Sequence, residues 1–208
     1  MIMWKGNMSW CNCNNHISYD NNCLIEIIDF FVLHCPVSIR SRVTDGTWPD
    51  GKKKKKTIYK DVSVRECSFH KNGVSGSLLS TILAEIRRPL AKQGLFQIIK
   101  SDGDVVSTVE SLINNRTCSD QWSDLLIIQT RSEMPDSEAI YYYIRNAFAH
   151  GSFEILVDDK NRIIYRLECQ KDGVVKAQMQ LKESTLLRLK ALAKKSPQEI
   201  KKLQRHKK

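Results

Sequence analysis

Long apolar runs are missing from this sequence. No stretch of about eighteen or more consecutive apolar residues occurs, and that is the length a membrane-spanning helix needs. The N-terminal residues also lack the charged segment, apolar segment and small-residue cleavage site that together mark a secretory signal. We therefore expect a cytoplasmic protein with no membrane partner.

Cysteine spacing typical of a disulfide-stabilised module is missing as well. The seven cysteines are an odd number, which fits a reducing compartment. Cys11, Cys13 and Cys23 lie close to His16, but Cys-x-Cys followed by a lone histidine differs from the paired knuckles of structural zinc sites. We predict no bound metal and no cofactor.

Acidic residues are scarce relative to basic ones, with 23 Asp and Glu against 33 Lys and Arg. The formal net charge is +10 and the pI is near 9.3. Such a charge indicates a polyanionic partner, because neutralising phosphates releases their counterions. An anionic membrane surface offers the same charge, so the charge alone does not choose between the two. We predict RNA as the partner.

Five adjacent lysines concentrate part of this charge in one segment. Residues 43–60 are predicted to form a loop, because Asp45-Gly46, Pro49 and Asp50-Gly51 are turn signals. A run of like charges does not pack, and the ordinary interpretation is a solvated tip. A lysine cluster can also hold a nucleic-acid backbone without reading its sequence. The candidate RNA-binding residues are Lys52, Lys53, Lys54, Lys55 and Lys56.

The segment IRNAFAHG, residues 144–151, carries the strongest chemical signal. It places Arg145, Asn146 and His150 at the end of a predicted helix. Arginine is permanently charged and presents a planar fork of donors that matches a phosphate. Histidine exchanges a proton near neutral pH. Neither the arginine nor the histidine needs a metal to do this. Arg145, Asn146 and His150 are therefore candidate catalytic residues for metal-independent phosphate chemistry.

The helix that carries these residues can be derived from its own sequence. Asp136 and Ser137 follow Pro135 and are predicted to supply N-cap oxygens. Apolar residues then recur at spacings of three and four, and Gly151 ends the helix. At about 100° per residue, Asn146 and His150 share one edge of the apolar stripe, and Arg145 lies toward the other edge. This separation predicts a composite site that uses two copies of the helix.

Arginine, a polar residue directly after it, and histidine four residues after the arginine resemble the motif of the HEPN (higher eukaryotes and prokaryotes nucleotide-binding) domains. The resemblance covers residues 136–151. Within this family, the segment resembles the small plasmid- or defence-associated HEPN ribonucleases. It implies a homodimer that cleaves RNA without metal, and it leaves room for an antitoxin or other regulatory partner. Ser152 stands where some HEPN toxins carry a modified tyrosine, so control by adenylylation is not implied.

The spacing of the apolar residues divides the rest of the chain into predicted helices and strands. Helices are predicted over 20–34, 77–91, 107–115, 119–130 and 184–194, and strands over 153–157, 162–169 and 174–181. The expected fold is mainly α (α+β), an HEPN-like helical bundle with an appended small antiparallel β-meander and a C-terminal helix. The expected divisions are a flexible leader (1–19), the helical domain (20–151), the meander with its helix (152–195) and a frayed basic tail (196–208).

Three functional hypotheses follow. The first is a metal-independent endoribonuclease, acting as a toxin or antiviral defence effector, in which a ribose 2′-hydroxyl attacks the adjacent phosphate. In it His150 transfers protons, Arg145 stabilises the phosphate charge and Asn146 orients His150 or the phosphate. The second is a non-catalytic RNA- or nucleotide-binding module. The third is an interaction protein in which the motif is fortuitous.

Overall fold

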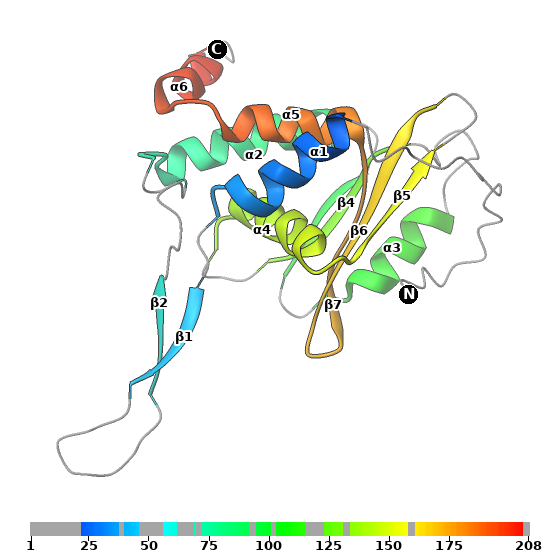
Figure 1. Cartoon of the computed structure of the whole chain (residues 1–208), viewed down its shortest axis with the longest axis horizontal. Helices are drawn as coiled ribbons and strands as arrows, with labels where there is room; N and C mark the ends of the chain where they lie inside the picture. Colours follow the sequence, from blue (N-terminus) through cyan, green and yellow to red (C-terminus); the bar gives the residue numbers. More distant parts are fainter. Residues whose placement is uncertain are drawn as a thin grey trace.

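A five-stranded mixed sheet forms the centre of the computed structural model (Figure 1). The structure describes residues 22–37, 40–45, 56–61, 69, 72–91, 95–100, 103–114, 123–130, 134–157 and 161–205. The strands, in the order β3-β4-β7-β6-β5, are β3 (Phe96–Ile99), β4 (Leu125–Gln129), β7 (Val174–Lys182), β6 (Ile163–Lys171) and β5 (Phe153–Val157). β3 and β4 are parallel, and every other neighbouring pair is antiparallel.

Helices cover both faces of this sheet (Figure 1). Alternate residues of β4 show the two layers: Leu126 and Ile128 join the large core under α1, α2, α4 and α5, whereas Leu125 and Ile127 pack against α3. A further helix, α6, packs against α2. The helices are α1 (Asn22–Ile28), the π-helix η1 (Asp29–His34), α2 (Gly76–Ala91), α3 (Val105–Asn114), α4 (Asp136–Ala149), α5 (Glu183–Ala193) and α6 (Pro197–Arg205).

The expected helical bundle with an appended meander is wrong. β7 of the expected meander pairs with β4, so the meander and the upstream strands form one sheet. The predicted helix over 119–130 is also wrong, because Leu125–Gln129 is a strand with every residue buried. A strand buried on both faces is a continuous apolar run without alternation, and such a run cannot be told from a buried helix by its period.

Four of the predicted helices and all three predicted strands agree with the structure. The helices expected over 20–34, 77–91, 107–115 and 184–194 are present with ends shifted by a few residues, and so are the three strands after Gly151. Gly151 itself has a φ of 66° and ends α4, as expected. Asp172 and Gly173 have φ values of 53° and 76°, which form the tight turn between β6 and β7.

The segment expected to be a loop over 43–60 contains paired strands at both of its ends. β1 (Arg40–Asp45) pairs antiparallel with β2 (Lys56–Asp61), and this two-stranded ribbon projects from the body of the molecule (Figure 1). Lys56 is the first residue of β2, whereas Lys52, Lys53, Lys54 and Lys55 lie outside the described residues. Their contribution to RNA binding therefore stays a prediction.

The expected frayed tail is instead the helix α6. Ser196 caps it: the Ser196 hydroxyl and backbone N–H both donate to the Glu199 carboxylate, and the Glu199 N–H donates back to the hydroxyl. These bonds hold the pKa of Glu199 below its usual value. Ser-x-x-Glu is the sequence signature of a capping box, so the signal was present in residues 196–199.

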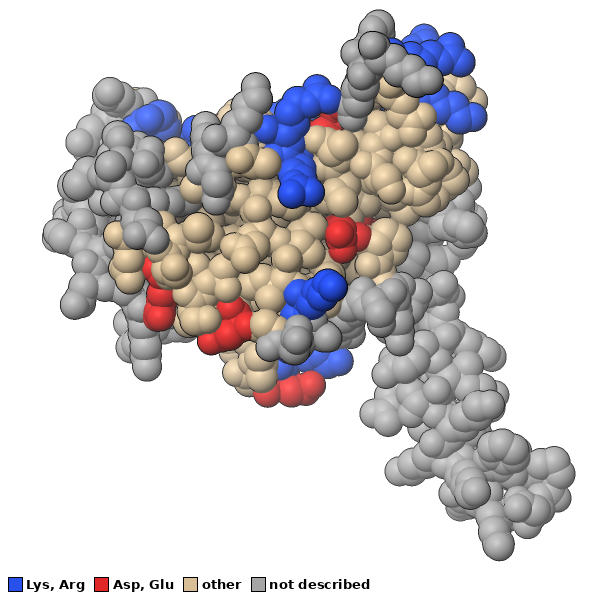
Figure 2. All heavy atoms as spheres, turned by 180° about the vertical axis from the view of Figure 1, so that it is seen from behind, with Lys and Arg blue, Asp and Glu red and all other residues tan. Residues whose placement is uncertain are grey.

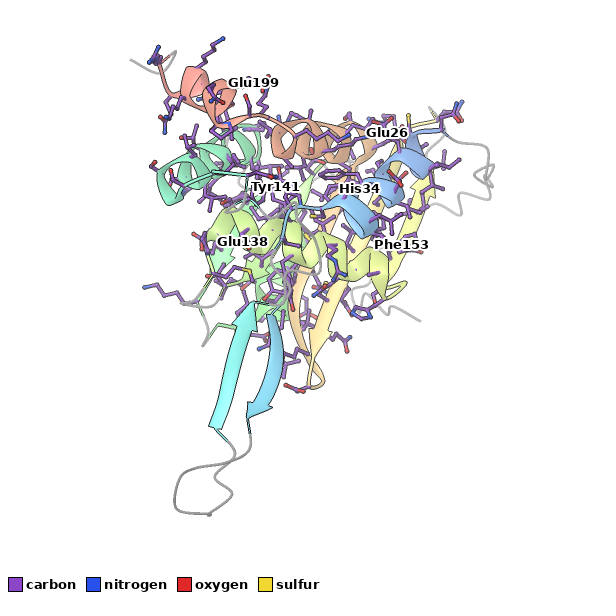
Figure 3. All side chains as sticks on the ribbon, turned by 60° about the vertical axis from the view of Figure 1, so that its left-hand side comes forward. Glu26, His34, Glu138, Tyr141, Phe153 and Glu199 are labelled. Atoms are coloured by element: carbon purple, nitrogen blue, oxygen red, sulfur yellow. The ribbon has the colours of Figure 1, made fainter. Side chains whose placement is uncertain are left out.

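α4 is fixed firmly against the sheet and its neighbouring helices. Ile140 and Ile144 are fully buried in the core, and the hydroxyl of Tyr141 donates to the Leu189 carbonyl of α5. Tyr141 lies between α4 and the helices packed over it (Figure 3). The core therefore fixes the orientation of the residues at the end of α4.

No helix in the described part of the chain has the length and apolar character needed to cross a membrane.

Candidate functional site

The structure places the three motif residues on the last turns of α4. Arg145 and Asn146 are half-buried, and His150 is exposed directly after the helix. The His150 backbone has a φ of −99° and a ψ of 3°, and its N–H still donates to the Asn146 carbonyl. His150 is thus held by the backbone of α4 while its imidazole is accessible to solvent.

Arg145 is bound to its sequence neighbour. Its Nη1 donates to Oδ1 of Asn146 at 3.1 Å. Its Nε is buried and has no hydrogen-bond acceptor among the described residues. A buried charged donor without a partner costs free energy, on the order of 1–3 kcal/mol, which an incoming anion or a second chain would recover. Asn146 therefore orients the guanidinium, and its Nε has no acceptor within the described residues.

A groove of about 620 Å³ lies between the end of α4 and the β6–β7 hairpin, and we call it the hairpin groove. Asn146 and His150 both line it, as expected from their position on one edge of α4. Arg145 does not line it, which agrees with its expected place toward the other edge. The full lining is Tyr142, Tyr143, Asn146, His150, Ser152, Glu168, Cys169, Gln170, Lys171 and Lys176.

Two lysines give the hairpin groove a basic wall. Lys171 is exposed and stands directly before the turn at Asp172 and Gly173. Lys176 follows the turn, and its Nζ donates to Oε1 of Gln129 at 2.6 Å. The sequence predicted only a strand on either side of this segment. The groove combines these two cations with an amide and an imidazole, a set of donors suited to a phosphodiester.

A buried carboxylate completes the polar surface beside these lysines. Glu168 is 7% exposed, and its two oxygens accept hydrogen bonds from Nε2 of Gln170 and Nε2 of Gln178, both at 2.7 Å. Glu168 was not predicted as a site residue from the sequence. The signal was the alternation along β6, in which Leu167 and Cys169 belong to the core and Glu168 lies between them on the opposite face.

Cys169 lines the groove without being a nucleophile. Its Sγ donates to the Tyr143 carbonyl at 2.9 Å, and burial raises the pKa of its thiol to about 12. The thiol is therefore protonated near neutral pH, whereas nucleophilic cysteines act as thiolates. Chemistry in this groove falls to the imidazole, amide, carboxylate and ammonium groups.

The charge of the molecule is spread over more than this groove. Figure 2 shows basic residues gathered at α6, with basic and acidic residues scattered over the rest of that face.

Within the described residues no group of three or more His, Cys, Asp or Glu side chains is arranged to hold a metal ion. Of the sequence-based metal candidates, Cys11, Cys13 and His16 lie outside the described residues. Cys23 lies beside Glu183, which raises the pKa of its thiol.

Comparisons with protein-family models, with curated proteins and with solved structures gave no match.

Proposed function

We propose that this protein is a metal-independent endoribonuclease whose active centre is the hairpin groove. The observation that carries the proposal is the placement of Asn146, His150, Lys171 and Lys176 along one groove, with Arg145 hydrogen-bonded to Asn146 beside it. Phosphate recognition and proton transfer thus come together at the end of one rigid helix. RNA is the substrate in this proposal because its 2′-hydroxyl is an internal nucleophile.

The proposed reaction is a transesterification within the RNA chain. The 2′-oxygen forms a bond to the adjacent phosphorus, and the bond from phosphorus to the 5′-oxygen of the next nucleotide breaks. A base accepts the proton of the 2′-hydroxyl, and an acid protonates the departing 5′-oxygen. His150 transfers protons, Arg145 stabilises the charge that develops on the phosphate, and Asn146 orients the guanidinium. The products are a 2′,3′-cyclic phosphate and a 5′-hydroxyl.

The direct test uses purified protein, end-labelled RNA and excess EDTA. The proposal requires cleavage that leaves cyclic phosphate and 5′-hydroxyl ends. An antitoxin or another regulatory partner would control such an activity in the cytoplasm, where a toxin or antiviral effector would meet its RNA.

A non-catalytic RNA- or nucleotide-binding module is the second candidate function. The observation in its favour is that Arg145 lies outside the lining of the hairpin groove that contains His150. A binding module needs only the cations and amides of the groove, not a concerted acid and base. Salt-dependent RNA binding without any product in the EDTA assay would favour this alternative.

We further propose that the catalytic unit is a homodimer. The buried Nε of Arg145 has no acceptor among the residues that the structure describes, and Arg145 is not part of the lining of the groove that contains His150. A second copy that places its motif helix against the first brings both arginines and both histidines to one central cleft. A two-fold axis generates this arrangement from a single interface.

The dimer proposal predicts the behaviour of mixed variants. Co-expressing Arg145→Ala and His150→Ala chains with different tags and purifying the doubly tagged dimer should restore almost no RNA cleavage. The reason is that a central cleft needs both copies of each residue. Strong rescue would instead assign Arg145 and His150 of one site to different chains. An active monomer in size-exclusion chromatography would contradict both arrangements.

The basic wall of the groove gives a separate prediction. Lys171→Gln should weaken binding of 2′-O-methyl RNA, which cannot react, by a similar factor for unrelated sequences. The slope of log K against log salt should fall by about 0.7 to 1, because one phosphate contact is lost. Lys201→Gln, at an exposed lysine of α6, is the matched control. An unchanged salt slope in Lys171→Gln would remove this lysine from the RNA interface.

A further inference from the structure

A second cavity, of about 510 Å³, lies at the other end of α4, where the parallel strands β3 and β4 end. We call it the strand-end cavity. From β3 the chain passes to α3 on one face of the sheet, and from β4 it passes to α4 on the opposite face. Diverging connections of this kind leave a crevice outside the carboxyl ends of the strands, where open α/β sheets bind their ligands.

Polar groups line one side of the strand-end cavity. Lys100 directly follows β3, and Thr130 directly follows β4. Asp136 and Ser137 begin α4 at the cavity wall. Ser137 is only 2% exposed, and its hydroxyl makes no hydrogen bond with the residues that the structure describes. Both the ammonium of Lys100 and this buried hydroxyl can donate to an anionic ligand.

The start of α4 adds backbone donors to the same place. The sequence predicted N-cap oxygens from Asp136 and Ser137, but Pro135 occupies the N-cap, and no side chain in the described part of the chain accepts a hydrogen bond there. The N–H groups of the first turn also lack acceptors within the helix. They can donate hydrogen bonds to an oxygen atom of a ligand in the cavity.

Apolar side chains form the other side. Leu79 and Leu83 of α2 and Met134 before α4 line the cavity opposite the polar groups. They offer a surface for a flat, apolar ring. The Asp136 carboxylate is an acceptor, which repels a phosphate close to it but binds a hydroxyl. The cavity thus combines an anion site, a hydroxyl acceptor and an apolar wall.

We propose that the strand-end cavity binds a nucleoside 5′-monophosphate. Lys100 and Ser137 hold the phosphate, Asp136 accepts a hydrogen bond from a ribose hydroxyl, and the base lies on Leu79, Leu83 and Met134. The 14 residues of α4 separate this site from His150 by about 20 Å of helix, so it is distinct from the hairpin groove.

Isothermal titration of the full chain with AMP, GMP, CMP and UMP tests the proposal. At least one of these nucleotides should bind about tenfold more tightly than its nucleoside and than inorganic phosphate. The nucleoside lacks the charge-assisted phosphate contact, and inorganic phosphate lacks the contact of the base. Lys100→Gln should weaken that nucleotide by about tenfold but leave binding of the nucleoside unchanged. Ser137→Val should also weaken the nucleotide. Lys201→Gln and His150→Ala should not change its affinity.

Several results would overturn the site. One is the absence of saturable binding of all four nucleotides at millimolar concentration. Another is binding that Lys100→Gln leaves unaltered, and a third is binding that His150→Ala abolishes, which would assign the nucleotide to the hairpin groove. Lys100 is exposed, so its replacement should leave the thermal unfolding midpoint unchanged and the comparison valid.

Discussion

His150→Ala should lower the rate of RNA cleavage in EDTA by about 10²- to 10⁴-fold, the range that proton transfer by a positioned side chain contributes. Arg145→Ala should lower it by about 10²- to 10³-fold, because the developing phosphate charge loses its donor. Steady-state and single-turnover assays on one defined RNA would measure both effects. His150 is exposed after α4, so the loss should not follow from unfolding.

Two further variants separate the chemistry from the fold. Arg145→Lys keeps the charge but loses the planar fork that donates to Asn146, so it should recover little activity. His34→Ala, at an exposed histidine of η1 that faces Asp29, is the matched control and should retain full activity. Cleavage that survives both Ala substitutions, or that requires added magnesium, would exclude the proposed catalytic residues.

The second large effect concerns the strand that the sequence did not reveal. Leu126→Ala should lower the free energy of unfolding by about 2–5 kcal/mol, because it removes a fully buried side chain and leaves a cavity under the helices. Leu126 also has neighbours on both sides within the sheet, since β4 lies between β3 and β7. Urea denaturation followed by circular dichroism would measure the change.

Ile25→Ala is the matched control for this substitution. Ile25 is apolar and helical, but it is 56% exposed, so its truncation should change the free energy of unfolding by less than about 0.5 kcal/mol. A loss below about 1 kcal/mol for Leu126→Ala would contradict the placement of β4 at the centre of the sheet.

The sequence predicted α4 and the strands after Gly151 well. Ile140, Ile144 and Ala147 of α4 recur at helical spacing and are all buried, and Gly151 ends the helix with a positive φ. The strands after Gly151 were predicted from their runs of β-forming residues and from turn signals such as Asp172-Gly173. β4 could not be predicted in this way, because Leu125 and Leu126 are both buried on opposite faces and its apolar run has no period.

The hairpin groove shows the same limit at the level of chemistry. Asn146 and His150 were predicted to share an edge because they lie one turn apart on a single helix. Glu168 and Lys171 lie about twenty residues further along the chain, and no local spacing relates them to His150. They reach the groove because β6 returns antiparallel to β5, so that the Glu168 N–H donates to the Ser152 carbonyl, two residues after His150.

The sequence by itself determined which side chains can bind phosphate and transfer protons, and that the end of α4 presents two of them together. Those properties depend on residue type and on helical geometry, both of which are local. Only the tertiary structure decided that Lys171 and Lys176 line the same groove as these residues and that Arg145 is not part of its lining. It also decided that Lys100 and the start of α4 meet at one cavity. These placements depend on strand order and on the face of the sheet that each helix covers, and burial of the shared core sets both.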